Sequence, residues 1–151
     1  MEYIAEPFLH PTHPKKGRRK IRCISKNNQL NLLIALSDAK DFKKDKIVRL
    51  KDLINIQIKS VELNNKKKKI KKIIALYHSK ELNRDFPIIQ WVPEKENIPV
   101  SILKPDGSMS YGNGEISLLQ IPMNKTIQFE RVGFVNPFRL KDNTLFCYFT
   151  H

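Results

Sequence analysis

The sequence predicts an all-β protein built from one or two small antiparallel β-barrels. Short β-branched runs recur along the chain, turn-forming residues bound these runs, and long amphipathic helical patterns are scarce. Many short strands with few helix signals are typical of antiparallel barrels. A chain of 151 residues has room for one ordinary domain or two small barrels, but not for a nucleotide-binding catalytic domain beside another domain.

The first strands are expected in the segments KIRCIS and LNLLIAL. Both hold partly alternating apolar residues, and the polar KNNQ separates them, so the two are expected to pair as a hairpin. The charged segment SDAKDFKKDK follows and predicts a short helix or turn, because Ser37 or Asp38 has the side chain of a helix N-cap.

The middle of the chain holds the clearest strand alternation. Residues 47–50 and 54–63 are expected to be strands, with apolar side chains alternating from Ile54 onward. NNKKKKIKK at 64–72 follows, and its two asparagines favour the turn of a hairpin. We interpret its lysines as a solvated edge that protects the hairpin from aggregation, with phosphate contact as the alternative.

The second half holds further strand segments separated by turns. FPIIQWVP is an apolar strand flanked by Pro87 and Pro93, and VSILKPDGSMSYGNG contains the turn sequences PDG and GNG. KTIQFERVGFVNPFRL and TLFCYFTH are two more strand-like stretches. Their aromatic residues are Phe129, Phe134, Phe138, Phe146, Tyr148 and Phe149.

The charge of the chain indicates a polyanionic partner. Lys and Arg number 28 against 15 Asp and Glu, a formal net charge of +13. Such an excess attracts phosphate-bearing polymers, and the release of counterions favours binding. A membrane surface, an acidic protein and a merely lysine-rich surface are alternatives that charge alone leaves open. Because the sequence has neither a bilayer-spanning apolar run nor a signal peptide, we expect a cytoplasmic protein without membrane contact.

The sequence lacks the motifs of the common catalytic classes. It has no GxSxG, P-loop or GxGxxG motif and no recognisable pair of catalytic carboxylates. Asp106 and Glu115 lie beside glycines, which predicts turn-forming roles. His10 and His13 alternate with prolines, which predicts an extended segment packed on a barrel. Binding without turnover is therefore the expected function.

Metal coordination is not expected from the cysteines and histidines. Cys23 and Cys147 are far apart, and neither belongs to a CxxC pattern, so we expect two buried structural thiols. The histidines form no HxxxH or HExxH pattern. The chain itself is expected to hold no cofactor.

The segment KKGRRK is a candidate phosphate-binding site. Gly17 allows close approach of the backbone to a sugar-phosphate chain, and arginines form bidentate contacts with phosphate. The candidate residues are Lys15, Lys16, Arg18 and Arg19. An ordinary basic surface turn is the alternative.

Four segments, taken in order, resemble the anticodon-binding region of glutaminyl-tRNA synthetases and of archaeal and eukaryotic cytosolic glutamyl-tRNA synthetases. The segments are HPTHPKKGRRKI at 10–21, IVRLKDL at 47–53, IIQWVP at 88–93 and IQFERVGF at 127–134. QFERxGF following a QWVP strand is the most specific combination. The terminal FCYFTH resembles the ending of archaeal glutamyl enzymes, so we favour glutamate over glutamine.

The resemblance implies two small antiparallel β-barrels and a set of residues that bind the anticodon. Residues 1–20 and 98–151 would form the proximal barrel, which we expect to be incomplete, and 21–97 the distal barrel. The implied anticodon contacts are Arg49, Lys51, Gln128 and Arg131. Lysine at position 51 lacks the planar fork of the arginine that the family can carry there. A polar pair on a strand face is the alternative for Gln128 and Arg131.

The resemblance also implies the partners. Glutamate tRNA would bind through its anticodon stem-loop, and a separate catalytic half of the ligase would cover the open edge of the proximal barrel. ATP and magnesium are expected only at that catalytic domain, so the chain is either a fragment or one subunit of a synthetase made in two pieces. Alternatives are a stand-alone RNA-binding barrel, a glutaminyl-tRNA synthetase fragment, and an assembly subunit that binds tRNA only in the complex.

Overall fold

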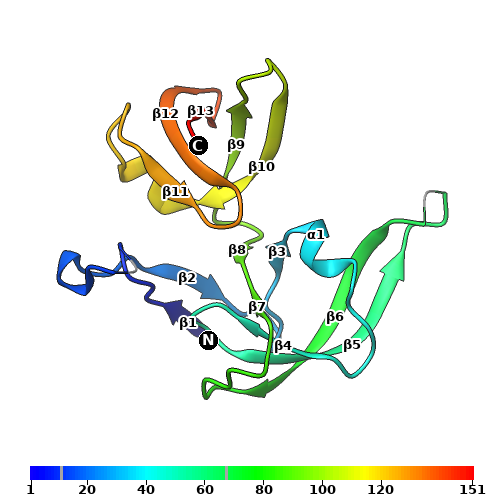
Figure 1. Cartoon of the computed structure of the whole chain (residues 1–151). Helices are drawn as coiled ribbons and strands as arrows, with labels where there is room; N and C mark the ends of the chain where they lie inside the picture. Colours follow the sequence, from blue (N-terminus) through cyan, green and yellow to red (C-terminus); the bar gives the residue numbers. More distant parts are fainter. Residues whose placement is uncertain (11, 67) are drawn as a thin grey trace.

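The computed structural model describes residues 1–10, 12–66 and 68–151, and it confirms the all-β prediction. Figure 1 shows two lobes, the first formed by strands up to β8 and the second by the strands from β9 onward. The first lobe contains β1 (Glu2–Ala5), β2 (Ile21–Ile24), β3 (Leu32–Ile34), β4 (Ile47–Leu50), β5 (Asn55–Leu63), β6 (Ile70–Ser79), β7 (Ile88–Ile89) and β8 (Trp91–Pro93). The second contains β9 (Asn97–Leu103), β10 (Met109–Glu115), β11 (Ile127–Phe129), β12 (Gly133–Lys141) and β13 (Thr144–Phe149). The helical segments are η1 (Pro14–Lys16), α1 (Leu36–Ala39) and η2 (Ile116–Gln120).

The second lobe is one curled sheet with the strand order β10-β9-β13-β12-β11. Its neighbours are antiparallel except for β13 and β9, whose parallel pairing departs from the expected antiparallel arrangement. In the described part of the chain the end strands β10 and β11 do not pair, so the sheet is an open half-barrel. Its buried core consists of Ile98, Val100, Ile102, Val135, Leu145 and Cys147.

The first lobe packs three sheets around a separate core. A four-stranded sheet has the order β6-β5-β4-β7, and β1-β2 and β3-β8 form two-stranded sheets. The predicted strand IIQWVP is divided at Gln90, because β7 pairs with β4 whereas β8 pairs with β3. The buried core residues are Ala5, Cys23, Phe42, Val48, Leu50, Leu53, Ile58, Ile89 and Trp91.

The predicted hairpin between KIRCIS and LNLLIAL is wrong, although both segments contain strands. The turn itself forms, with an isolated bridge between Lys26 and Gln29 and two asparagines in left-handed conformations between them. The chain then diverges, because β2 pairs with β1 and β3 pairs with β8. Local turn chemistry thus predicted the bend, while burial of Cys23 beside Ala5 decided the strand partner.

Two predictions for the charged connections have different outcomes. The helix α1 confirms the short helix, but its N-cap is Ala35, so the prediction of Ser37 or Asp38 as N-cap is wrong. The strands β5 and β6 confirm the hairpin around NNKKKKIKK, in which Asn64 N–H donates to Lys69 O at 2.7 Å. Lys67 lies outside the described residues.

The predicted division into barrels stays a prediction. Ala5 packs in the core of the first lobe, although residues 1–20 were assigned to the same barrel as 98–151. Arg19, in contrast, contacts the second lobe through Glu115. The packing favours two units that are nearly continuous in sequence, joined where β8 leads into β9 (Figure 1).

The two cysteines are buried free thiols, as expected. Burial raises the pKa of each to about 11, with a further contribution from Glu96 for Cys23, so both are neutral at physiological pH. Within the described residues no group of three or more His, Cys, Asp or Glu could hold a metal ion. Over the same residues, no helix has both the length and the apolar character needed to cross a membrane.

Leu145→Ala is expected to lower the free energy of unfolding by about 3 kcal/mol, because Leu145 is 1% exposed in the core of the second lobe. Its cross-strand partner Leu140 is 47% exposed, so Leu140→Ala provides a matched control and is expected to cost less than about 1 kcal/mol. Urea denaturation of both variants measures the difference. Equal losses would show that the second lobe does not contain the core described here.

Candidate nucleic-acid interface

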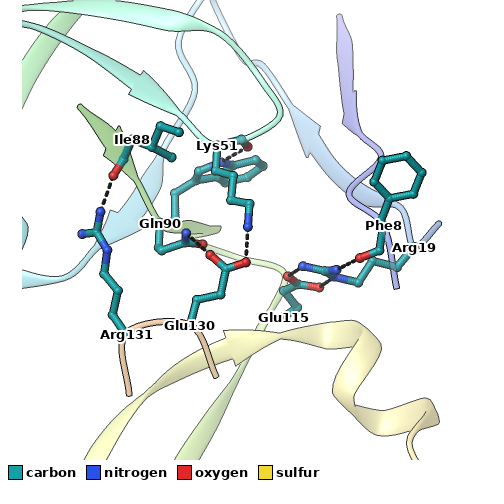
Figure 2. Close-up of polar contacts among 9 residues, drawn as sticks. Phe8, Arg19, Lys51, Ile88, Gln90, Glu115, Glu130 and Arg131 are labelled. Atoms are coloured by element: carbon teal, nitrogen blue, oxygen red, sulfur yellow. Dashed lines mark hydrogen bonds and ion pairs between the residues drawn. The ribbon is translucent and has the colours of Figure 1, made fainter. Parts of the chain in front are cut away.

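The turn between β11 and β12 brings the second lobe onto the first. Val132 N–H donates to Phe129 O at 3.0 Å, and Arg131 has a left-handed backbone with φ of 64°. This tight turn directs Glu130 and Arg131 toward β4 and β7 of the first lobe (Figure 2). The QFER segment therefore forms part of the junction between the lobes.

Glu130 is the central acceptor at this junction. Its two carboxylate oxygens accept hydrogen bonds from Lys51 Nζ and from Gln90 Nε2 (Figure 2). The backbone oxygen of Lys51 accepts a hydrogen bond of 2.9 Å from the indole nitrogen of Trp91, which fixes the backbone at Lys51 against the core. One carboxylate thus holds a cation and an amide of the opposite lobe.

Arg131 makes the second polar contact between the lobes. Its guanidinium donates to Asp38 of α1 and to the backbone oxygen of Ile88 in β7. Asp38 was predicted as an N-cap, but it lies inside the helix and pairs with Arg131. The short helix therefore supplies a carboxylate to the junction.

Arg49 lies at the same place on the β4–β7 pair. It is the register partner of Ile88, whose oxygen accepts from Arg131. Nη1 of Arg49 donates to Asn55 Oδ1 at 2.9 Å and to Lys80 O at 3.0 Å. Of the predicted anticodon-binding residues, Arg49 and Lys51 thus lie on β4 and directly after it, and Arg131 contacts the neighbouring β7, while the guanidinium of Arg49 itself is bonded on the β5–β6 side.

Gln128 lies on β11, opposite Phe134 and two residues before Glu130. Its side chain is exposed and forms no hydrogen bond with any described residue. Since an amide has both donors and an acceptor, this side chain is available to the edge of an unpaired base. The fourth predicted residue thus leads into the junction without contacting the other three.

The predicted phosphate-binding residues divide into two groups. Lys15 and Lys16 are exposed in η1, and the guanidinium carbon of Arg18 stacks 3.8 Å from the centre of the exposed Phe8 ring. Arg19 instead forms a bidentate pair with Glu115, at 2.6 and 2.8 Å, and donates to Phe8 O at 2.7 Å (Figure 2). Arg19 therefore links the lobes, and its phosphate contact stays a prediction.

The two histidine rings before this basic segment lie beside each other. The ring centres of His10 and His13 are 4.5 Å apart, and His13 is exposed, so the expectation that both pack on a barrel is wrong. Desolvation, followed by His13 and Lys16, lowers the pKa of His10. Loss of contact with water and the nearby positive charge thus both disfavour the protonated form of His10.

The acidic partners of the junction were not predicted from the sequence. Asp106 forms the expected turn, accepting from Ser108 Oγ at 2.6 Å and from Ser108 N–H at 2.9 Å, and these bonds lower its pKa. Glu115 was expected to do the same but pairs with Arg19 across the lobes. Glu130 lies 79 residues from Lys51 in sequence, so no local pattern indicates that pair.

Comparison with known protein families identifies the chain. Two family models match it, at residues 1–78 and 88–137, and both describe the anti-codon binding domain of class I tRNA synthetases (E and Q). The chain belongs to this family. The predicted resemblance to the anticodon-binding region is confirmed, and all four quoted segments lie inside the matched ranges.

Relatives of this anticodon-binding chain carry the name glutamate–tRNA ligase. The protein from Methanobrevibacter smithii is 35% identical over 145 residues, which cover 95% of this chain and 23% of the relative. Those from Methanocaldococcus jannaschii and Pyrococcus horikoshii are 26% and 29% identical, covering 95% and 99% of this chain and 24% and 25% of the relatives. The chain spans about a quarter of the length of these relatives.

Gly133→Ala is expected to destabilise the protein by about 2 kcal/mol, because Gly133 ends the Glu130–Arg131 turn with φ of 133°. An added Cβ would lie 2.7 Å from a ring carbon of Phe149 and 2.8 Å from the backbone oxygen of His151. Gly112 has open space around it and no left-handed backbone, so Gly112→Ala is the control. Urea denaturation compares the two, and equal midpoints would contradict the constraint on this turn.

Proposed function

We propose that this chain is the anticodon-binding module of a glutamyl-tRNA synthetase and recognises the anticodon loop of glutamate tRNA at the junction of its lobes. The observation that carries the proposal is the convergence of Arg49, Lys51 and Arg131 on the β4–β7 pair. Membership of the anticodon-binding family and relatives named glutamate–tRNA ligase support the choice of RNA and amino acid.

Recognition of single-stranded loops requires donors and acceptors that reach splayed bases. Gln128 offers both, and the arginines offer paired N–H donors that match a base edge or a phosphate. Lys51 contributes a point charge, and its contact is correspondingly less directional. Specificity would come from the base contacts, while phosphate contacts would set the position of the loop.

Two of these cations are paired within the protein before RNA arrives. The side chains of Lys51 and Glu130 are 31% and 43% exposed, and those of Arg131 and Asp38 are 50% and 13% exposed. The Lys51–Glu130 pair has contact with water at both ends, and such pairs contribute little to stability, on the order of 0 to 1 kcal/mol. An RNA phosphate can therefore replace Glu130 as the partner of Lys51 at small cost.

The exposed Lys15, Lys16 and Arg18 supply affinity for phosphates that is independent of base identity. Arg19 would serve chiefly to hold the lobes through Glu115, because Nε, Nη1 and Nη2 all donate within the protein. Aminoacylation, with its ATP and magnesium, would take place on a separate catalytic domain that adjoins this module.

Binding of glutamate tRNA and of a copy with a changed anticodon tests the proposal. The unmutated chain is expected to prefer glutamate tRNA, and Arg131→Ala and Gln128→Ala are each expected to weaken that binding roughly tenfold, as removal of a base-specific hydrogen bond does. Arg139→Ala and Gln120→Ala are matched controls, because both residues are exposed in the same lobe outside the junction. Equal affinity for the two RNAs would overturn anticodon recognition and favour a general RNA-binding protein.

The double variant Lys15→Ala, Lys16→Ala is expected to weaken binding of both RNAs by the same factor. The slope of log affinity against log salt concentration should become shallower by about one for each of these lysines that binds a phosphate. Fluorescence anisotropy at several salt concentrations measures the slope. Lys95→Ala, Lys104→Ala removes the same charge from other exposed positions and serves as the control. If the control variant lowers the salt slope by the same amount, the lysines of η1 make no phosphate contact of their own.

A further inference from the structure

Asn55 is a polar side chain that the first lobe buries completely. It lies on β5 with 0% exposure, as the register partner of Arg49 on β4 and of Ser79 on β6. Its amide nitrogen donates to Ser79 Oγ at 2.9 Å and to Glu81 O at 2.7 Å, and its oxygen accepts from Arg49 Nη1 at 2.9 Å. All of its polar atoms therefore have partners, as burial requires.

The orientation of the Asn55 amide follows from the chemistry of its neighbours. The backbone oxygen of Glu81 can only accept, and the guanidinium of Arg49 can only donate. The nitrogen of Asn55 must therefore face Glu81 and its oxygen must face Arg49. Because the nitrogen is held by two acceptors, the oxygen has one direction in which to point.

Arg49 is held by one of its three nitrogens. Nη1 donates to Asn55 Oδ1 at 2.9 Å, to Lys80 O at 3.0 Å and, more weakly, to Glu81 O at 3.5 Å, all neutral acceptors. Nε and Nη2 make no hydrogen bond to any residue in 1–10, 12–66 or 68–151, so this edge of the fork is available to a ligand. Fixing one nitrogen orients the planar group and reduces the rotamer entropy lost on binding.

We infer that Asn55 is a positioning residue for RNA recognition, which fixes the Arg49 guanidinium so that its Nε and Nη2 edge faces the anticodon loop. The same amide also holds the loop after β6, since Glu81 O accepts from Asn55 and the adjacent Lys80 O accepts from Arg49. Asn55 is too deeply buried to touch RNA itself. This inference rests on the proposed function, because it gives Arg49 a role at the RNA site.

A double-mutant cycle tests the inference by measuring dissociation constants for glutamate tRNA with the unmutated chain, Arg49→Ala, Asn55→Ala and the double variant. Arg49→Ala and Asn55→Ala are each expected to weaken binding about tenfold, the effect of removing one hydrogen bond to a charged group. The double variant should bind no more weakly than Arg49→Ala alone, because Asn55 acts only through Arg49. Additive losses would overturn the inference.

Two further variants separate positioning from support of the fold. Ser79→Ala removes a partner of Asn55 but leaves its contact with Arg49, so binding should stay within about twofold while unfolding becomes easier. Asn55→Asp keeps an oxygen for Arg49 and loses both donors, so it should cost stability and retain tighter RNA binding than Asn55→Ala. If Asn55→Ala does not fold, Asn55→Ser takes its place in the cycle. Binding losses that follow stability across these variants would assign Asn55 to the fold alone.

The outcome for Arg49→Ala separates failure of the proposed function from failure of the inference. Unchanged tRNA binding in Arg49→Ala would overturn the proposed role of Arg49 and the inference with it. Weaker binding in Arg49→Ala together with unmutated affinity in Asn55→Ala would overturn the inference alone.

Discussion

The two lobes meet where carboxylates neutralise cations. Glu130 accepts from Lys51 and Gln90, Asp38 pairs with Arg131, and Glu115 pairs with Arg19. Lys and Arg number 28 against 15 Asp and Glu, and bringing cationic surfaces together without carboxylates between them would be unfavourable. These acidic side chains therefore allow the cationic surfaces of the two lobes to meet, although each exposed pair by itself contributes little stability.

The cations at the junction have two different kinds of partner. Arg49 donates to the neutral acceptors Asn55 and Lys80 O and keeps its full charge, whereas Lys51 and Arg131 face carboxylates. The hydrogen bonds to neutral acceptors orient the Arg49 guanidinium, and the exposed Glu130 can be exchanged for another anion as the partner of Lys51. The junction therefore has one oriented guanidinium and, near it, a cation whose anionic partner can change.

Strands and turns, which depend on neighbouring residues, could be predicted from the sequence, whereas ion pairs between residues far apart in the chain could not. Strand-forming residues predicted β4, alternation from Ile54 onward predicted β5, and turn residues predicted the hairpin around Asn64, because these features depend on neighbouring residues. The family motifs also indicated Arg49, Lys51 and Arg131, which lie on or against the β4–β7 pair. The partners of these cations could not be predicted, since Asp38 lies 93 residues from Arg131, and Glu115 has the sequence context of a turn residue.

The indole of Trp91 contacts the backbone of a residue at the junction, and the sequence contains no other tryptophan. The ring is 7% exposed, and its N–H donates to Lys51 O. The emission of a tryptophan depends on the polarity around its indole and on the hydrogen bond of its nitrogen. The protein thus contains its own fluorescent reporter at the lobe junction, so occupancy there is observable without attaching a dye.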